Sequence, residues 1–202
     1  MKKNVLNLYA GIGGNRKLWA DVDVTAVEIN PKIAKIYQDF FPDDTVVIGD
    51  AHQYLLEHYD DGWDFIWSSP PCQSHSSFRK NICVRYGGTK PVYPDMSLWQ
   101  EILFLKYHAE CYWVVENVKP YYKPLIDGIV LQRHMFWANF EIIDKKFDND
   151  NIRIIQIPEL QNKHGFDLSK YEIKNKRQIL RNCVYPQLGK HVFDCAFKTN
   201  SD

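Results

Sequence analysis

The chain has 202 residues, of which 45% are hydrophobic, and its 25 basic and 25 acidic residues give a formal net charge of zero. This composition is typical of a globular protein and excludes a disordered or fibrous chain. The length indicates one domain, or one domain with a small appendage. Residues 1–64 hold 11 acidic and 6 basic residues, and the remainder holds 14 acidic and 19 basic residues. The basic part of the chain therefore suits a polyanionic partner.

The sequence carries no pattern of a membrane or secreted protein. No apolar run approaches the roughly 20 residues that span a bilayer, and the N-terminus lacks the apolar region of a signal peptide. The five cysteines are odd in number and none has the C-x-x-C spacing. We expect a cytoplasmic protein with free thiols and no bound metal.

Strands and helices alternate along the first 115 residues. Glycines follow the first expected strand, and Asn30-Pro31 provides an N-cap and a first-turn proline for a helix. Such alternation predicts a parallel sheet with helices on both faces. The expected strands are residues 4–9, 22–28, 45–48, 64–67 and 112–115, and the expected helices are residues 16–20, 30–41, 51–57 and 96–107.

The remainder of the chain gives weaker patterns. Residues 74–94 have no clear period and predict a long loop, whereas residues 135–143 indicate further strand structure. Residues 144–176 are polar and irregular. A helical pattern returns over residues 176–197, with an interruption at residues 182–186.

The residues with chemical potential follow the expected strands. A glycine-rich turn at residues 11–14 lets a ligand approach the backbone, although a plain tight turn is the alternative. Glu28 ends the second strand, where an acid binds the hydroxyls of a ribose, or it is a solvated carboxylate. Asp50 ends the third strand, where it accepts a hydrogen bond from an adenine amine or caps the next helix.

Cys72 follows two prolines at the end of the fourth strand and enters a polar loop. A nucleophilic thiolate needs such a fixed position in a partly exposed, electropositive setting, and the alternative is an inert buried cysteine. Glu116 comes after the fifth strand, so we expect it near Cys72. A carboxylic acid with a raised pKa at that place protonates a ring nitrogen, whereas an exposed loop acid is the alternative.

Taken in order, these motifs closely resemble the series of the DNA cytosine-5 methyltransferases over residues 4–140 and 177–197. The series comprises residues 6–14, Glu28, Asp50, residues 70–73, residues 116–118 and residues 181–186. The resemblance implies a class I methyltransferase (Rossmann-like) fold, α/β with a mixed, mostly parallel sheet, helices on both faces and a small C-terminal recognition insert. It also implies S-adenosylmethionine as the cofactor.

The resemblance assigns roles by position. Cys72 would attack C6 of a cytosine extruded from double-stranded DNA, and Glu116 would engage N3 and the exocyclic amine. Arg133 would take the arginine role near the extruded base, while a packed or exposed histidine is the preferred interpretation of His134. The implied cofactor-binding residues are Tyr9, Ala10, Gly11, Ile12, Gly13, Gly14, Glu28, Ile29, Asp50, Ala51, Pro70, Leu98, Asn182 and Cys183.

Two basic segments are candidates for contact with the nucleic-acid backbone, and a solvated surface is the alternative for both. Residues 79–90 hold four basic and no acidic residues and occupy the position of the family's mobile catalytic loop. Residues 163–181 hold six basic and two acidic residues. The expected nucleic-acid contacts are Gln73, Ser74, Arg79, Lys80, Arg85 and Lys90.

The resemblance divides the chain at two points. Residues 1–145 would form the catalytic domain, residues 146–176 a reduced target-recognition insert, and residues 177–202 a C-terminal helix that completes the catalytic domain. The alternatives are a tRNA cytosine-5 methyltransferase, a catalytically silent nucleic-acid-binding paralogue and an enzyme that uses a modified methionine cofactor. The target site and the oligomeric state stay open.

Overall fold

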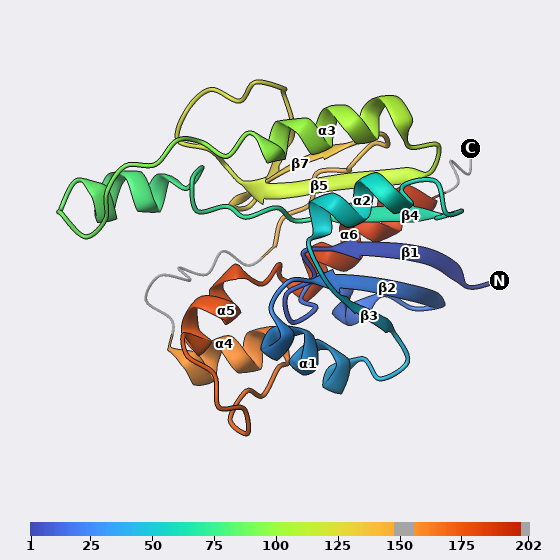
Figure 1. Ribbon diagram of the computed structural model, residues 1–202, viewed down its shortest axis with the longest axis horizontal. Coiled ribbons are helices and arrows are strands. Elements are labelled where there is room, and N and C mark those ends of the chain that lie inside the picture. The colour runs from blue at the N-terminus through green and yellow to red at the C-terminus, as the bar shows by residue number, and fades with distance from the viewer. Residues whose placement is uncertain (148–155, 199–202) are drawn as a thin grey trace.

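The computed structural model describes residues 1–147 and 156–198. Within them, seven strands form one sheet in the order β3-β2-β1-β4-β5-β7-β6, in which β1 to β5 run parallel (Figure 1). β7 runs antiparallel to both β5 and β6, so the sheet is mixed and mostly parallel, as predicted. The strands are β1 (Lys3–Leu8), β2 (Val22–Glu28), β3 (Thr45–Ile48), β4 (Phe65–Ser68), β5 (Tyr112–Val118), β6 (Ile129–Leu131) and β7 (His134–Ala138).

Helices cover both faces of the sheet. The helices are α1 (Pro31–Phe40), α2 (Ala51–His58), α3 (Ser97–His108), α4 (Ile157–His164), α5 (Lys176–Asn182) and α6 (Pro186–Phe197). Phe65 and Trp67 of β4 belong to a core cluster with α1 and α6, whereas Ile66 belongs to a cluster with α2 and α3. Alternate residues of a strand point to opposite faces, so one short apolar strand supplies both cores.

Local sequence explains where the first two helices begin. Asn30 caps α1, because its side chain accepts hydrogen bonds from the backbone N–H groups of Lys32 and Ile33. Asp50 caps α2 in the same way, and Oδ1 accepts from the N–H of Gln53 at 2.9 Å. Each cap comes two residues after a strand ends. α1 and α2 therefore start at the edge of the sheet where β2 and β3 end.

The strand prediction was too short for β5 and too long for β7. β5 continues to Val118 because β7 pairs with it over Glu116, Asn117 and Val118. Glu116 therefore lies within a strand rather than after one. β7 ends at Ala138, and a tight turn with Gln132 at φ 54° joins it to β6. A local sequence pattern does not reveal the β5–β7 pairing, because other residues, including β6, lie between the two strands in the chain.

Two further segments refine the sequence prediction. The first expected helix is a single helical turn over Arg16–Leu18. The expected long loop contains a helical segment, Arg79–Val84, which projects away from the sheet in Figure 1. Within the described residues, every helix is too short or too polar to pass through a lipid bilayer.

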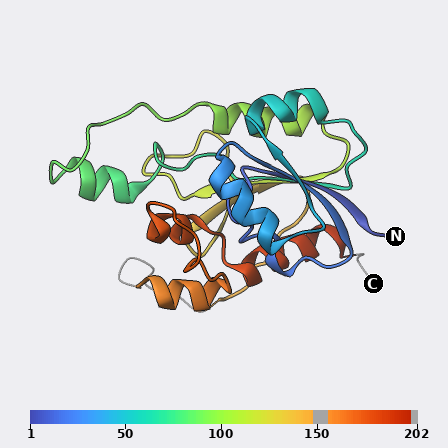
Figure 2. The same ribbon diagram turned by 60° about the horizontal axis from the view of Figure 1, so that its bottom comes forward.

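Much of the segment between β7 and α5 packs against α1. Leu160, Phe166 and Leu168 are fully buried in a third core cluster with Ile12 and Ile36. The side-chain ammonium of Lys17 also donates to the carbonyl of Gly165 at 2.8 Å. Figure 2 shows α4 and α5 close to the end of α1. The described part of the expected recognition insert thus adds to the protein core, and residues 148–155 of it lie outside the described residues.

Phe166 provides a test of this packing. Its ring meets that of Phe40 edge to face at a centroid distance of 4.8 Å. We predict that Phe166→Ala lowers the free energy of unfolding by about 3–5 kcal/mol, as other truncations of buried aromatic residues do. Chemical denaturation measures this change. Tyr93→Ala, at a fully exposed aromatic residue, is the control and changes the stability by less than about 0.5 kcal/mol. Equal effects of the two substitutions would contradict the packing.

Candidate functional site

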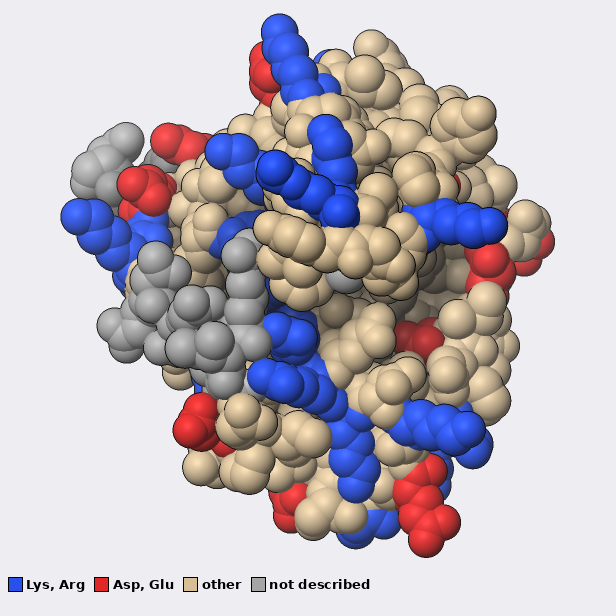
Figure 3. Space-filling model, turned by 90° about the vertical axis from the view of Figure 1, so that its left-hand side faces the viewer, with Lys and Arg blue, Asp and Glu red and all other residues tan. Residues whose placement is uncertain are grey.

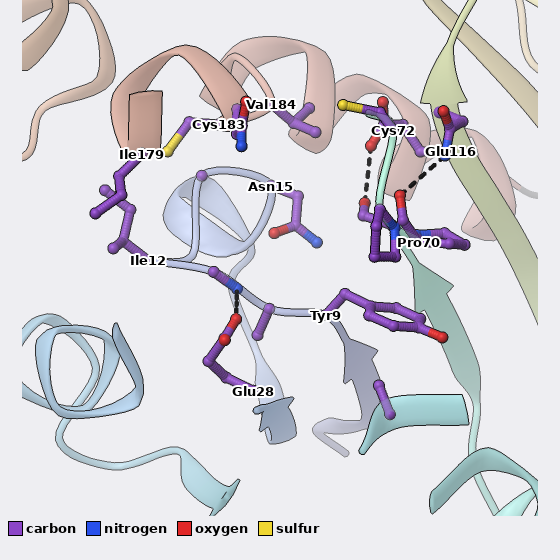
Figure 4. Close-up of a pocket in the computed structure, with 18 of the residues that line it drawn as sticks. Tyr9, Ile12, Asn15, Glu28, Pro70, Cys72, Glu116, Ile179, Cys183 and Val184 are labelled. Carbon is purple, nitrogen blue, oxygen red and sulfur yellow. Dashed lines mark hydrogen bonds between the residues drawn. The ribbon is translucent and has the colours of Figure 1, made fainter. Parts of the chain in front are cut away.

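A cavity of about 400 Å³ lies at the carboxyl ends of β1, β2, β4 and β5, and the junction of α5 and α6 forms its opposite wall (Figure 4). Its volume is typical of a small-molecule site, and its position is the usual one for ligands of open α/β sheets. The lining residues are Tyr9, Ala10, Gly11, Ile12, Gly14, Asn15, Glu28, Ile29, Ile33, Asp50, Ala51, Ser69, Pro70, Pro71, Cys72, Gln73, Glu116, Asn117, Val118, Arg133, His134, Ile179, Asn182, Cys183 and Val184.

The cavity brings together nearly all of the residues expected to bind the cofactor or to act in catalysis. Gly13 and Leu98 do not border it. A Cβ at Gly13 would lie 2.3 Å from the ring of Phe41, so this glycine faces α1 instead. Leu98 is buried in the cluster beneath α3. Both residues therefore shape the surroundings of the cavity rather than its surface.

The carboxylate of Glu28 holds the glycine turn. Oε2 accepts a hydrogen bond from the N–H of Gly11 at 3.0 Å, and Oε1 accepts from the N–H of Asn30 at 2.8 Å. Gly11 has a φ of 56°, which glycine adopts without strain, and no atom lies within 4 Å of where a Cβ would be. The backbone of the turn is thus open to a ligand. Each oxygen of Glu28 keeps a lone pair for a further donor.

Gly14 lets the turn after β1 contact the segment between α5 and α6. A Cβ on this residue would lie 2.6 Å from the carbonyl oxygen of Val184 and 3.0 Å from the Cβ of Cys183. Only a glycine allows so close an approach. The segment between α5 and α6 therefore closes over the turn after β1, and Asn182, Cys183 and Val184 complete the wall of the cavity.

Tyr9 is held by a buried carboxylate that the sequence did not reveal. Its hydroxyl donates to Glu101 of α3, which is fully buried. Glu101 also accepts from the hydroxyl of Ser68 at 2.6 Å and lies 2.9 Å from Nδ1 of His52. Burial, followed by the charge of Glu101, raises the pKa of Tyr9 well above its usual value. These bonds fix the ring of Tyr9 as one wall of the cavity.

Cys72 lies at the opposite end of the cavity from Glu28 (Figure 4). The N–H groups of His75 and Ser76 donate to its carbonyl oxygen, and Asn117 Nδ2 donates to the carbonyl of Pro70 at 2.9 Å. Burial and the negative charge of Glu116 raise the pKa of the Cys72 thiol to about 11, against the opposing charge of Arg133. Burial and the charge of Glu116 therefore outweigh the positive charge that the sequence led us to expect around Cys72. The free thiol keeps its proton at neutral pH.

Glu116 is buried and has two protein partners. Oε2 accepts from the hydroxyl of Ser69 at 2.8 Å, and Oε1 lies 2.5 Å from Nδ1 of His134. Burial by itself raises the pKa of Glu116, but the charge and hydrogen bond of His134, with help from Ser69, lower it below its usual value. The expectation of a raised pKa was wrong, because His134 lies against this carboxylate.

Arg133 reaches the cavity from the turn before β7. One guanidinium nitrogen donates to the carbonyl oxygen of Arg181 at 2.8 Å and to that of Cys183 at 3.2 Å. The side chain thus ties the end of the sheet to the α5–α6 junction. Its positive charge also opposes the rise in the pKa of Cys72.

Of the residues expected to contact nucleic acid, Gln73 borders the cavity. The hydroxyl of Ser74 accepts from the N–H of Asp95 at 2.9 Å, and Arg79 donates to the carbonyl of Lys90 at 3.1 Å. The ammonium of Lys80 lies over the ring of Tyr121. These bonds order the segment that follows Cys72. Lys and Arg side chains flank a hollow on the face shown in Figure 3.

The sequence did not single out several residues of the cavity. His134 was interpreted as a packed or exposed histidine, and it is packed, but its contact with Glu116 was not foreseen. Its place beside a glutamate 18 positions earlier depends on the β5–β7 pairing, which no local pattern indicates. The lining residues outside every motif are Asn15, Ile33, Ser69 and Ile179. Pro71, Asn117, Val118 and Val184 belong to the motifs, but the sequence assigned them no individual role.

The contact at Gly14 leads to a stability prediction. Gly14→Ala forces a methyl group against the Val184 carbonyl, and we predict a loss of about 1–3 kcal/mol in the free energy of unfolding. Gly49→Ala is the matched control, because a Cβ at Gly49 meets no atom within 4 Å. Thermal or chemical unfolding of both variants measures the difference. An unchanged stability of Gly14→Ala would contradict the close contact.

The pair of Glu116 and His134 leads to a pH-dependent prediction. His134→Leu leaves a buried carboxylate without its partner, so we predict a loss of about 3–5 kcal/mol at neutral pH. A lowered pKa of Glu116 stabilises the folded protein above the pKa of the unfolded state, and this contribution disappears as the pH falls through the folded pKa. The difference between the two proteins therefore shrinks on acidification.

Denaturation curves between pH 3 and pH 7 measure this prediction. The exposed pair of Lys190 and Asp194 is the control, since Lys190→Ala changes stability by less than about 0.5 kcal/mol at any of these values. A constant effect of His134→Leu across the range would contradict a charged Glu116.

One known structure shares the fold over nearly the whole chain. The Entamoeba histolytica methyltransferase EhMeth aligns with a TM-score of 0.54 and 14% identity, over 96% of this chain and 98% of that chain. A mutant of Spodoptera frugiperda DNMT2 gives 25% identity and a TM-score of 0.40 over 58% of this chain and 36% of that one. A putative DNA modification methyltransferase of an E. coli prophage gives 17% identity and a TM-score of 0.47, over 79% and 54%.

The chain thus spans about a third of the length of the insect protein and about half that of the prophage protein. No curated protein matches the sequence. The family model of the C-5 cytosine-specific DNA methylases matches residues 3–120, which include β1 to β5 and the lining residues from Tyr9 to Val118. The chain belongs to the C-5 cytosine-specific DNA methylase family.

Proposed function

We propose that the protein transfers a methyl group from S-adenosylmethionine to C5 of cytosine in DNA, through a covalent bond between Cys72 and C6. The observation that carries the proposal is the set of residues at the two ends of one cavity. A carboxylate beside a glycine turn borders one end of it, and a cysteine and a buried glutamate border the other. A donor and an acceptor bound at these two ends would face each other within a single enclosed space.

The end with Glu28 suits the cofactor. S-adenosylmethionine supplies an electrophilic methyl group. Glu28 has free lone pairs for the ribose hydroxyls, and the open backbone at Gly11 accommodates the amino-acid part. Asp50 uses Oδ1 to cap α2, which leaves Oδ2 for an adenine amine. Tyr9, fixed by Glu101, offers a rigid apolar surface beside it.

The end with Cys72 suits the cytosine. A thiol with a raised pKa is a weak nucleophile, so attack has to be coupled to proton transfer. In the proposed step the thiol gives its proton to the Glu116 carboxylate, and Glu116 gives a proton to N3. Sulfur bonds to C6, the C5–C6 double bond is lost, and the C4–C5 enamine that forms is nucleophilic at C5. After methylation, solvent takes the C5 proton, the C5–C6 double bond forms again as Cys72 leaves as a thiolate, and the N3 proton returns through Glu116 to that thiolate.

The base has to leave its helix for this chemistry, because C6 and C5 are inaccessible within a stack. The cavity lies at the carboxyl ends of the strands, and the basic segment of residues 79–90 follows its lining residues Cys72 and Gln73 along the chain. In the proposal, Arg79, Lys80, Arg85 and Lys90 meet backbone phosphates there, while Gln73 and Arg133 lie near the extruded base.

A transfer assay tests the proposed function. The protein is incubated with S-adenosylmethionine labelled in the methyl group and with duplex DNA or tRNA in parallel. We predict label at C5 of cytosine in DNA and at least a 10³-fold lower rate for Cys72→Ala, which lacks the nucleophile. Cys111→Ala is the matched control, since Cys111 lies outside the cavity, and it keeps the wild-type rate.

Three outcomes would contradict the proposal in different ways. Label in tRNA alone would establish an RNA methyltransferase. Label in neither polymer would favour a silent binding protein. Transfer at an undiminished rate by Cys72→Ala would exclude the covalent route.

A further inference from the structure

Asn15 borders the cavity, and the proposed function has given it no role. It follows the glycine turn after β1, and only 5% of its surface is exposed. Figure 4 shows its side chain between Glu28 and Cys72, which mark the two ends of the cavity. Its backbone packs tightly on α6, because a Cβ on Gly189 would lie 2.5 Å from the carbonyl oxygen of Asn15. The side chain is therefore held in place between the two ends.

A chain of buried polar groups sets which end of the Asn15 amide faces the cavity. Nδ2 of Asn15 donates to Oδ1 of Asn7 at 2.8 Å. The hydroxyl of Tyr37 donates to Asp44 at 2.8 Å. Burial, followed by the charge of Asp44, raises the pKa of Tyr37, and Asn7 opposes this rise as a hydrogen-bond donor does. Nδ2 of Asn7 therefore faces Tyr37, where it makes no well-formed hydrogen bond within the described residues, and Oδ1 faces Asn15.

The other end of the Asn15 amide is open to a ligand. Within residues 1–147 and 156–198, Oδ1 accepts no hydrogen bond, and it is not one of the completely buried polar atoms that lack a partner. Because Asn15 borders the cavity, the accessible part of this oxygen faces it. An amide oxygen accepts hydrogen bonds and donates none, and it binds charged donors more strongly than neutral ones. This oxygen therefore suits a cationic donor.

The carboxylates that border the cavity have other roles in the proposed function. Glu28 binds backbone N–H groups and would bind the ribose, whereas Asp50 caps α2 and would meet the adenine. Glu116 is bound to His134 and Ser69 and would meet the cytosine. The α-ammonium group of S-adenosylmethionine still needs an acceptor, because a cation that leaves water without a partner is costly.

The other side-chain amides of the cavity are less suited to this group. Asn117 is bound at both ends by backbone groups, each at 2.9 Å. Gln73 and Asn182 are exposed, so water competes for their amides. Asn15 combines a buried, oriented amide with an oxygen that the described residues leave open.

We propose that Asn15 binds the α-ammonium group of S-adenosylmethionine through Oδ1 and thereby positions the amino-acid part of the cofactor. The inference rests on the proposed function, because it concerns the cofactor of the same site. The amino-acid part and the methyl group are attached to one sulfur atom. An ammonium group bound at Asn15 therefore restricts the directions in which the methyl group can point.

Equilibrium binding tests the proposal without the transfer reaction. S-adenosylhomocysteine has the same amino-acid part as the cofactor, and its deamino analogue has hydrogen in place of the α-amino group. Isothermal titration calorimetry measures the dissociation constants of both ligands for wild type and Asn15→Ala. We expect Asn15→Ala to raise the dissociation constant of S-adenosylhomocysteine at least about tenfold, as loss of a hydrogen bond to a charged group does. The two proteins should bind the deamino analogue equally within about twofold, because that ligand lacks the group that Asn15 binds.

Asn139→Ala is the matched control. The Asn139 amide binds the N–H of Trp113 and the carbonyl of Cys111, each at 2.9 Å, and it does not border the cavity. We expect this variant to leave both dissociation constants unchanged. Equal effects of Asn15→Ala on both ligands, including no effect, would overturn the proposal. If wild type bound neither S-adenosylhomocysteine nor S-adenosylmethionine, the proposed function would fail instead, so the two failures are distinguishable.

A second measurement covers the case in which Asn15→Ala does not fold. A crystal structure of wild type with S-adenosylhomocysteine gives the distance between Oδ1 of Asn15 and the α-nitrogen of the ligand. We expect a hydrogen bond of about 2.7–3.2 Å. A distance above about 4 Å, or an amide that turns Nδ2 to the ligand, would overturn the proposal.

Discussion

The contact between the glycine turn after β1 and the segment before α6 is the constraint on which the cavity depends. Gly14 lies directly against the carbonyl of Val184, and Trp19 donates to the carbonyl of Gly189 in α6. Arg133 binds two carbonyl oxygens of the same segment from the other side. The C-terminal part of the chain thus closes over strand ends formed by residues 3–118. Without this closure, the carboxyl ends of β1, β2, β4 and β5 would form an open edge instead of a pocket.

The two ends of this cavity differ in the ionisable groups that border them. Near Glu28, the carboxylate is already bound by backbone N–H groups, which keeps it in place for a polar ligand. Near Cys72, burial keeps a thiol protonated while His134 keeps Glu116 ionised. A thiol that keeps its proton and an ionised carboxylate therefore border the same cavity. This arrangement favours a coupled transfer over attack by a preformed thiolate.

The sequence was informative where function depends on local pattern. The order of strands and helices, the cap at Asn30 and the residues at the ends of parallel strands follow from short-range signals, and the structure has most of these strand-end residues in the cavity. The sequence was uninformative where function depends on contacts between separate elements. Glu101 beneath Tyr9 and His134 beside Glu116 come from segments far away in the chain. Their polar partners, and hence the low pKa of Glu116, become apparent only in three dimensions. The packing of residues 157–168 on α1 is likewise a tertiary effect, because the polar composition of this segment conceals three buried apolar side chains.

In the proposed reaction, Cys72 forms a bond to the cytosine ring. A duplex that contains 5-fluorocytosine tests it directly, because fluorine at C5 prevents the elimination that releases the enzyme. The protein is incubated with this DNA and S-adenosylmethionine, digested, and examined by mass spectrometry for a peptide that carries the modified nucleotide. We predict a stable adduct on the peptide that contains Cys72, at the sulfur of that residue. An adduct on another cysteine, or methyl transfer to unmodified DNA with no adduct on the fluorinated duplex, would contradict it.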